Sequence, residues 1–189
     1  GFFDDKLDDR HTPSTYYALD FDTTPTQHLS DRLAAHPPGS TAYVLLTTGG
    51  FSPLHRGHIA MMEAAKHHLE RLGKSVLGGY LSPSHDSYVS KKYGGSATLA
   101  AHHRIELCQK ALVEHPWIMV DPWEARYTPR TVNFTNVIER LHGYISRRFP
   151  LLHEVRIVYV CGSDNAEFAH AFRYGGGDMI CVGRAGSIE

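Results

Sequence analysis

The sequence TTGGFSPLHRGH, which spans residues 47–58, restricts the fold of this chain more than any other stretch. An apolar run at residues 42–46 precedes it and predicts a buried strand. After it, apolar residues recur at steps of three and four over residues 59–72, which predicts one face of a helix. Gly49 and Gly50 let a phosphate approach the backbone closely, and the unpaired N–H groups of a helix start attract anions. The stretch therefore predicts a strand, a glycine-rich turn and a helix that bind a nucleotide phosphate.

Two histidines, His55 and His58, open the expected helix. Side chains three positions apart lie on the same helix face, so both imidazoles can point at one anion. We therefore take His55 and His58 as candidate phosphate-contacting residues of a nucleotide site.

Predicted strands and helices alternate along the rest of the chain. Alternation of this kind predicts an α/β fold, with a parallel sheet that helices cover on both faces. Residues 1–40 are interpreted as an N-terminal extension that packs on, or trails from, a domain at residues 41–189. Beyond the first strand and helix, the expected strands are 75–81, 117–120, 155–160 and 179–182, and the expected helices are 29–35, 98–113 and 131–149.

Polar or aromatic residues follow each expected strand. Ligands of parallel α/β sheets bind beyond the carboxyl ends of the strands, so this coincidence favours one joint site. Each of these residue types also has a plainer interpretation. The lysines can be an exposed pair in a polar loop at 82–92, the Trp can be packed beside an exposed Glu, the Asp can cap a helix, and the Arg can lie on the surface. The residues concerned are Lys91, Lys92, Trp123, Glu124, Gly162, Asp164 and Arg184.

Composition narrows the classes of partner. The formal net charge of −1 gives no bulk attraction to nucleic acid or to a membrane surface, and no apolar run approaches the ~20 residues of a membrane span. We expect neither partner and leave a homo-oligomer open. Three widely spaced cysteines without a CxxC pair favour free thiols and an intracellular location, cytoplasmic or nuclear.

Several motifs in order resemble one enzyme family. GGFSPLHRGH resembles the (H/T)xGH motif of the nucleotidyltransferases, and LSPSHDSYVSKK, WIMVDPWE, VCGSDNAEFA and ICVGRAG follow it with similar spacing over residues 43–186. The series is similar to the eukaryote-like nicotinamide/nicotinate mononucleotide adenylyltransferases. The resemblance implies a Rossmann-like fold, NAD synthesis from ATP and the mononucleotide, and a requirement for Mg²⁺.

The resemblance also implies roles for individual residues. It makes the two histidines, His55 and His58, the catalytic residues, which contact the phosphates. It gives further phosphate contacts to a lysine loop, pyridine-ring contacts to a Trp-Glu pair, and ATP contacts to residues at the ends of later strands. In this sequence the matching positions are Gly49, Gly50, Phe51, His55, His58, Lys91, Lys92, Gly162, Asp164 and Arg184 for ATP and the phosphates, and Trp123 and Glu124 for the mononucleotide.

The family's second motif, an ISSTxxR-like stretch, is expected after the Arg184 region, and residues 1–189 contain no match to it. Two alternatives therefore stay open beside the adenylyltransferase. One is a sister transferase with another phosphate acceptor, such as phosphopantetheine or a CTP-dependent substrate. The other is a non-catalytic nucleotide-binding module with the same fold.

Overall fold

The computed structural model describes residues 22–95, 98–166 and 177–183. Within them lies one sheet of five strands in the order β3-β2-β1-β4-β5, and all the neighbouring strands run parallel. This confirms the expected α/β, Rossmann-like fold. The strands are β1 (Thr41–Gly49), β2 (Ser75–Pro83), β3 (Ile118–Val120), β4 (Glu154–Gly162) and β5 (Asp178–Val182).

Strand β1 lies in the middle of the sheet because it is apolar on both faces. Val44, Leu45 and Leu46 are consecutive and fully buried, as expected of a strand covered by helices on two sides. It pairs with β2 on one side and β4 on the other. The turn that follows Gly49 therefore begins at the centre of the sheet edge.

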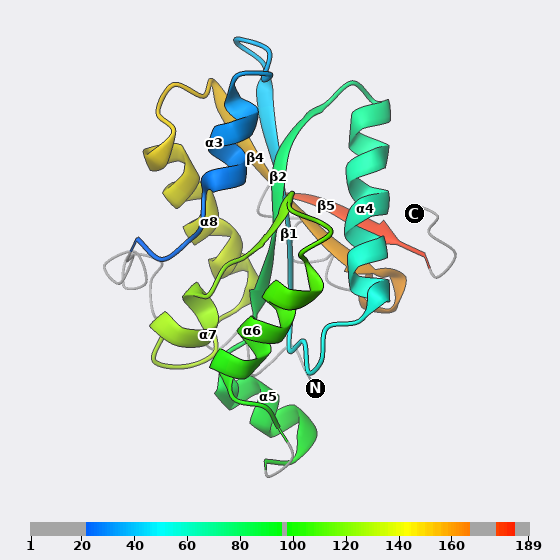
Figure 1. The fold of residues 1–189 in the computed structure, drawn as a ribbon, viewed down its shortest axis with the longest axis vertical. Helices are drawn as coiled ribbons and strands as arrows, with labels where there is room; N and C mark the ends of the chain where they lie inside the picture. Colours follow the sequence, from blue (N-terminus) through cyan, green and yellow to red (C-terminus); the bar gives the residue numbers. More distant parts are fainter. Residues whose placement is uncertain (1–21, 96–97, 167–176, 184–189) are drawn as a thin grey trace.

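Helices cover both faces of the sheet (Figure 1). Helices α4 and α6 pack in one apolar cluster, which includes Met62 and Cys108. Helices α3 and α8 pack in the other, which includes Leu29 and Leu141. The helices are α3 (Gln27–Leu33), α4 (Arg56–Arg71), α5 (Asp86–Tyr93), α6 (Ala101–Ala111), α7 (Trp123–Tyr127) and α8 (Phe134–Arg148).

The prediction of a polar loop at residues 82–92 was wrong. Strand β2 continues to Pro83, and the lysine pair lies in the last turn of helix α5. The His85 side chain caps this helix by accepting a hydrogen bond from the Ser87 N–H at 3.1 Å. Gly94 ends it in the left-handed conformation, with φ of 80°. Both lysines are therefore carried on a helix.

Residues 22–40 pack against the sheet. Leu29 of α3 is completely buried, and the Thr24 hydroxyl donates a hydrogen bond of 2.9 Å to Asp121. Asp121 also pairs with Arg140 of α8 at 3.1 Å, and both side chains are buried. This part of the predicted N-terminal extension is thus tied to the end of β3 and to α8.

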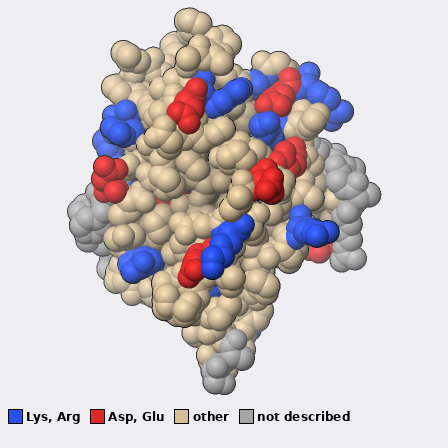
Figure 2. Space-filling model, in the orientation of Figure 1, with Lys and Arg blue, Asp and Glu red and all other residues tan. Residues whose placement is uncertain are grey.

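Positive and negative side chains are interspersed on the face of the molecule shown in Figure 2. Within the described residues, no helix is both long enough and apolar enough to cross a membrane.

Candidate functional site

A cavity of about 730 Å³ lies at the carboxyl ends of the central strands. Its walls come from the end of β1, the start of α4, helix α5, the start of α8 and the ends of β4 and β5. This is the edge at which parallel sheets bind their ligands. The structure brings eight of the predicted residues to the cavity: Gly49, Gly50, Phe51, His55, His58, Lys92, Gly162 and Asp164.

The turn after β1 is shaped by residues 49–53. Phe51 has φ of 45°, the left-handed region that few non-glycine residues adopt, and the Ser52–Pro53 peptide is cis. A Cβ on Gly50 would lie 3.6 Å from the side chains of both Val89 and Tyr93. Helix α5 therefore lies directly against the glycine turn.

His55 and His58 cap helix α4 reciprocally. His55 stands at the N-cap position, and its Nδ1 accepts a hydrogen bond from the Gly57 N–H at 3.1 Å. The His58 Nδ1 accepts from the His55 N–H at 3.2 Å. The two imidazole centroids are 3.7 Å apart, and the Phe51 ring meets His58 edge-on at 5.1 Å. The two side chains therefore lie together at the cavity, and their contact with one anion stays a prediction.

The hydrogen bond that His58 accepts fixes its proton. Burial of the half-buried ring, with a smaller contribution from neighbouring His55, lowers the pKa of His58 to about 4. The ring is therefore neutral at pH 7. Because Nδ1 accepts, the proton lies on Nε2, which leaves Nε2–H as a donor for a ligand.

The two lysines of α5 differ in position. Lys92 lines the cavity, whereas Lys91 does not. The Lys92 Nζ lies 6.0 Å from the ring centroid of Tyr88 and 5.2 Å from that of Tyr93. These aromatic rings hold the ammonium near the mouth of the cavity by cation–π attraction.

Trp123 and Glu124 do not line the cavity. Both side chains are completely buried, and the Arg140 guanidinium stacks over the Trp123 ring at 5.1 Å. Glu124 accepts a hydrogen bond of 3.2 Å from the Thr131 hydroxyl. Their contact with the mononucleotide stays a prediction, and Arg184 lies outside the described residues.

One wall of the cavity is aromatic, and the sequence did not predict it. Phe134 at the start of α8 packs on Tyr159 of β4 with ring centroids 4.8 Å apart, and the Tyr159 hydroxyl shares a hydrogen bond of 2.8 Å with Thr48. Asn133 caps α8 by accepting from the Thr135 N–H at 3.0 Å. Asn133 carried a usable signal, since Asn is a preferred N-cap residue. Tyr159 carried none, since it stands inside an apolar strand.

The described residues offer few side-chain ligands to a metal ion. Among the residues that the structure describes, no group of three or more His, Cys, Asp or Glu side chains is placed to hold one. Asp164 brings a carboxylate to the cavity. This donor set fits Mg²⁺ that is held mainly by substrate phosphates and water, since Mg²⁺ commonly uses only one or two protein carboxylates in such sites.

Comparison with known proteins confirms the family resemblance. Over 125 residues, 66% of this chain, the sequence is 37% identical to the nicotinamide/nicotinic acid mononucleotide adenylyltransferase of Arabidopsis thaliana, and the match covers 50% of that protein. For the rice enzyme (Oryza sativa subsp. japonica) the identity is 39% over 125 residues, which cover 48% of it. For nicotinamide/nicotinic acid mononucleotide adenylyltransferase 2 of Xenopus tropicalis it is 44% over 85 residues, 44% of this chain and 26% of the relative.

The chain thus spans about half the length of the plant relatives that it matches, and about a quarter of the frog relative. The cytidylyltransferase-like family model matches residues 46–173, a range that begins in β1 and includes the glycine turn, both histidines and α5. The chain therefore belongs to the cytidylyltransferase-like family, and within it resembles the nicotinamide/nicotinic acid mononucleotide adenylyltransferases.

Proposed function

We propose that the protein containing this chain transfers an adenylyl group from ATP to nicotinamide or nicotinate mononucleotide, which yields NAD or its deamido form and pyrophosphate. The observation that carries the proposal is the start of helix α4, where His55 and His58 face a cavity at the centre of the sheet edge. The names of the plant and frog relatives support the choice of substrates.

The reaction needs no general base. A phosphate oxygen of the mononucleotide is already an anionic nucleophile. It forms a bond to the α-phosphorus of ATP, and the bond from that phosphorus to the bridging oxygen breaks, so pyrophosphate leaves with the electron pair. The protein must bring two polyanions together and stabilise the charge on the α-phosphate, which is work for positioning and electrostatics.

The residues of the cavity suit this task. His58 offers its Nε2–H to a phosphate oxygen, and the start of α4 adds backbone N–H groups and the positive end of its dipole. Lys92 brings a positive charge to the same cavity from α5. Gly49, Gly50 and Phe51 allow close backbone approach, while Gly162 and Asp164 stand where the ATP ribose is expected.

We infer that Mg²⁺ enters with ATP as part of the substrate. Its chemistry there would be to neutralise charge on the departing pyrophosphate. Among the described residues, Asp164 is the carboxylate that lines the cavity, and no group of three or more His, Cys, Asp or Glu side chains there is placed to hold a metal ion.

The proposal includes location and partners. The described cysteines are free thiols, which fits the expected intracellular location, cytoplasmic or nuclear. The formal net charge of −1 fits a protein without a nucleic-acid or membrane partner. A homo-oligomer stays open.

An acceptor panel tests the proposal. ATP or CTP, each with Mg²⁺, is incubated with the protein and with nicotinamide mononucleotide, nicotinate mononucleotide or phosphopantetheine, and the products are separated by chromatography. We expect pyrophosphate release with ATP and either pyridine mononucleotide only. Release with phosphopantetheine or with CTP would indicate the sister transferase. Nucleotide binding without any release would indicate the non-catalytic module.

A further inference from the structure

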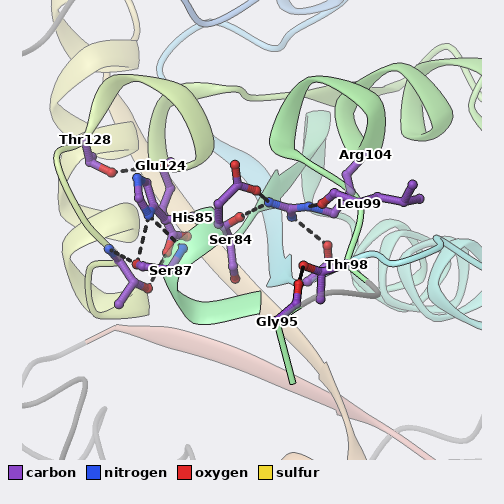
Figure 3. A network of polar contacts seen from close by, with 12 residues as sticks. Ser84, His85, Ser87, Gly95, Thr98, Leu99, Arg104, Glu124 and Thr128 are labelled. Atoms are coloured by element: carbon purple, nitrogen blue, oxygen red, sulfur yellow. Dashed lines mark hydrogen bonds and ion pairs between the residues drawn. The ribbon is translucent and has the colours of Figure 1, made fainter. Parts of the chain in front are cut away.

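One buried side chain, Arg104 of helix α6, joins the segments that carry the phosphate-binding groups. Arg104 is 0% exposed although it follows two exposed histidines in the sequence. Burial of an arginine is costly unless its donors are satisfied, so its partners indicate what it holds. Figure 3 shows its guanidinium between Ser84 and Leu99.

The guanidinium donates to four acceptors on three different segments. Nη1 donates to the Gly50 carbonyl at 2.7 Å, in the glycine turn. Nη2 donates to the Ser84 carbonyl at 2.7 Å and to the Asp86 carboxylate at 2.8 Å, where β2 passes into α5. Nε donates to the Leu99 carbonyl at 3.0 Å, just before its own helix. One planar, rigid group therefore fixes the distances between these segments.

The bond to Gly50 sets the direction of a backbone N–H group. The peptide between Gly50 and Phe51 is trans, so its C=O and its N–H point in opposite directions. Because the carbonyl points at Arg104, the Phe51 N–H points away from it. Both Gly50 and Phe51 line the cavity, so the bond from Arg104 fixes the orientation of this amide at the cavity wall.

The bond to Asp86 sets the position of helix α5. Asp86 is the first residue of that helix, and Lys92, in its last turn, lines the cavity. Helix α5 also packs on Gly50 through Val89 and Tyr93. A shift of the helix start would therefore move the lysine relative to the glycine turn.

We propose that Arg104 is a positioning residue, which holds the Phe51 amide and the Lys92 ammonium at the spacing that a nucleotide phosphate requires. The proposal rests on the proposed function for the identity of the substrates. The hydrogen bonds of Arg104 to Gly50, Ser84 and Asp86, here called the clamp, hold residues 49–58 against α5. Their role in holding these segments does not depend on which reaction the protein catalyses.

The test compares Arg104→Lys with a matched control in the same helix, Ile105→Ala. Lysine keeps the charge but replaces the guanidinium fork with a single nitrogen. Ile105 is buried in the apolar cluster beside Arg104, so its truncation loosens α6 without removing the clamp. If Arg104→Lys folds poorly, Asp86→Asn takes its place. This variant removes the charge of the carboxylate that pairs with Arg104, at a half-exposed side chain whose substitution disturbs the fold less.

Three quantities are measured for each variant: the melting temperature, the KM for ATP and for the mononucleotide, and amide hydrogen exchange. We expect Arg104→Lys to raise both KM values about tenfold and to speed amide exchange in residues 49–58 and 86–93 relative to α8. Asp86→Asn should raise the KM values and speed the exchange as well, but by less. Ile105→Ala should lower the melting temperature and leave KM unchanged. Unchanged KM and an exchange pattern like that of Ile105→Ala would overturn the positioning role.

Binding of inorganic pyrophosphate separates this proposal from the proposed function. If the wild type forms no NAD, the adenylyltransferase proposal fails, yet the clamp can still be tested. We then expect weaker pyrophosphate binding and faster exchange in Arg104→Lys than in Ile105→Ala. Equal binding and equal exchange in the two variants would overturn the role of Arg104 on its own.

Discussion

At the scale of single residues, the site depends on the protonation state of His58. The ring is held neutral because burial, with a smaller contribution from neighbouring His55, lowers its pKa. Its Nδ1 accepts the His55 N–H, so the proton lies on Nε2. The neutral ring offers one donor, Nε2–H. The positive charge that Lys92 and the helix start bring to the substrate phosphates is therefore not supplemented by a charge on His58.

The lowered pKa of His58 makes stability fall in acid. The pKa of His58 is about 4 in the folded protein, whereas the ordinary pKa of histidine is 6.5, so between these pH values the unfolded chain binds more protons than the folded one. The contribution is complete above about pH 6.5 and is lost as the pH falls towards 4. Melting temperatures measured from pH 7.5 to 4 should therefore fall more steeply for the wild type than for His58→Gln.

The comparison with His58→Gln cancels the effects of other groups, such as His28 and His85, whose pKa values burial also lowers. Two curves that fall in parallel would contradict the neutral, buried state assigned to His58.

At the scale of elements, helix α5 distinguishes its two lysines. Lys92 lines the cavity and Lys91 does not. Lys92→Ala should raise the KM for both phosphate substrates about tenfold, because a charge-assisted hydrogen bond is worth roughly 1.5–3 kcal/mol. Lys91→Ala is the matched control, one position away on the same helix, and should change KM by less than about twofold. Steady-state kinetics with each substrate varied in turn would check this, and the reverse order would show that the helix is rotated in the active protein.

The sequence predicted elements well where a periodicity extended over many residues. The strand–turn–helix unit around Gly49 and the alternation of strands and helices were predicted, because apolar runs and three-to-four spacing report burial directly. Helix α5 was not predicted. It has only eight residues, and the Pro83-Ser84-His85 stretch before it carries turn residues that mask a histidine cap.

The contacts that Arg104 makes could not be predicted either. Its acceptors at Gly50 and Ser84 are backbone carbonyls, 54 and 20 positions away along the chain, and no residue type marks a carbonyl as a partner. The surroundings of Trp123 and Glu124 could not be predicted either, because Trp123 contacts Arg140 and Glu124 accepts a hydrogen bond from Thr131, and both contacts depend on tertiary packing. The sequence identified the side chains that follow the strands. It could not predict which of them line the cavity, because that depends on how the helices pack on the sheet.

At the scale of the whole molecule, a buried ion pair ties the N-terminal segment to the sheet. Asp121 follows β3, Arg140 belongs to α8, and Thr24 bonds to both side chains. Loss of one charge from such a pair leaves the other buried without compensation. Asp121→Asn should therefore lower the free energy of unfolding by about 3–5 kcal/mol. Urea denaturation would measure this change.

A surface pair is the control for that prediction. Glu106 and Lys110 form an exposed ion pair on α6, 2.7 Å apart. Exposed pairs contribute little, so Glu106→Gln should leave the denaturation midpoint almost unchanged. Equal effects of the two substitutions would show that residues 22–26 are not anchored through Asp121.

The most direct test of the central claim is NAD formation by the wild type and by His58→Ala, measured beside their melting temperatures. The claim is that the start of helix α4 is the phosphate-transfer site. We predict that the wild type forms NAD from ATP and nicotinamide mononucleotide. We predict that His58→Ala loses about a hundredfold in kcat, the scale seen when one transition-state donor is removed, whereas its stability falls only by the roughly 1 kcal/mol of a lost helix cap. Loss of activity only in proportion to lost stability, or an unchanged kcat, would contradict the claim.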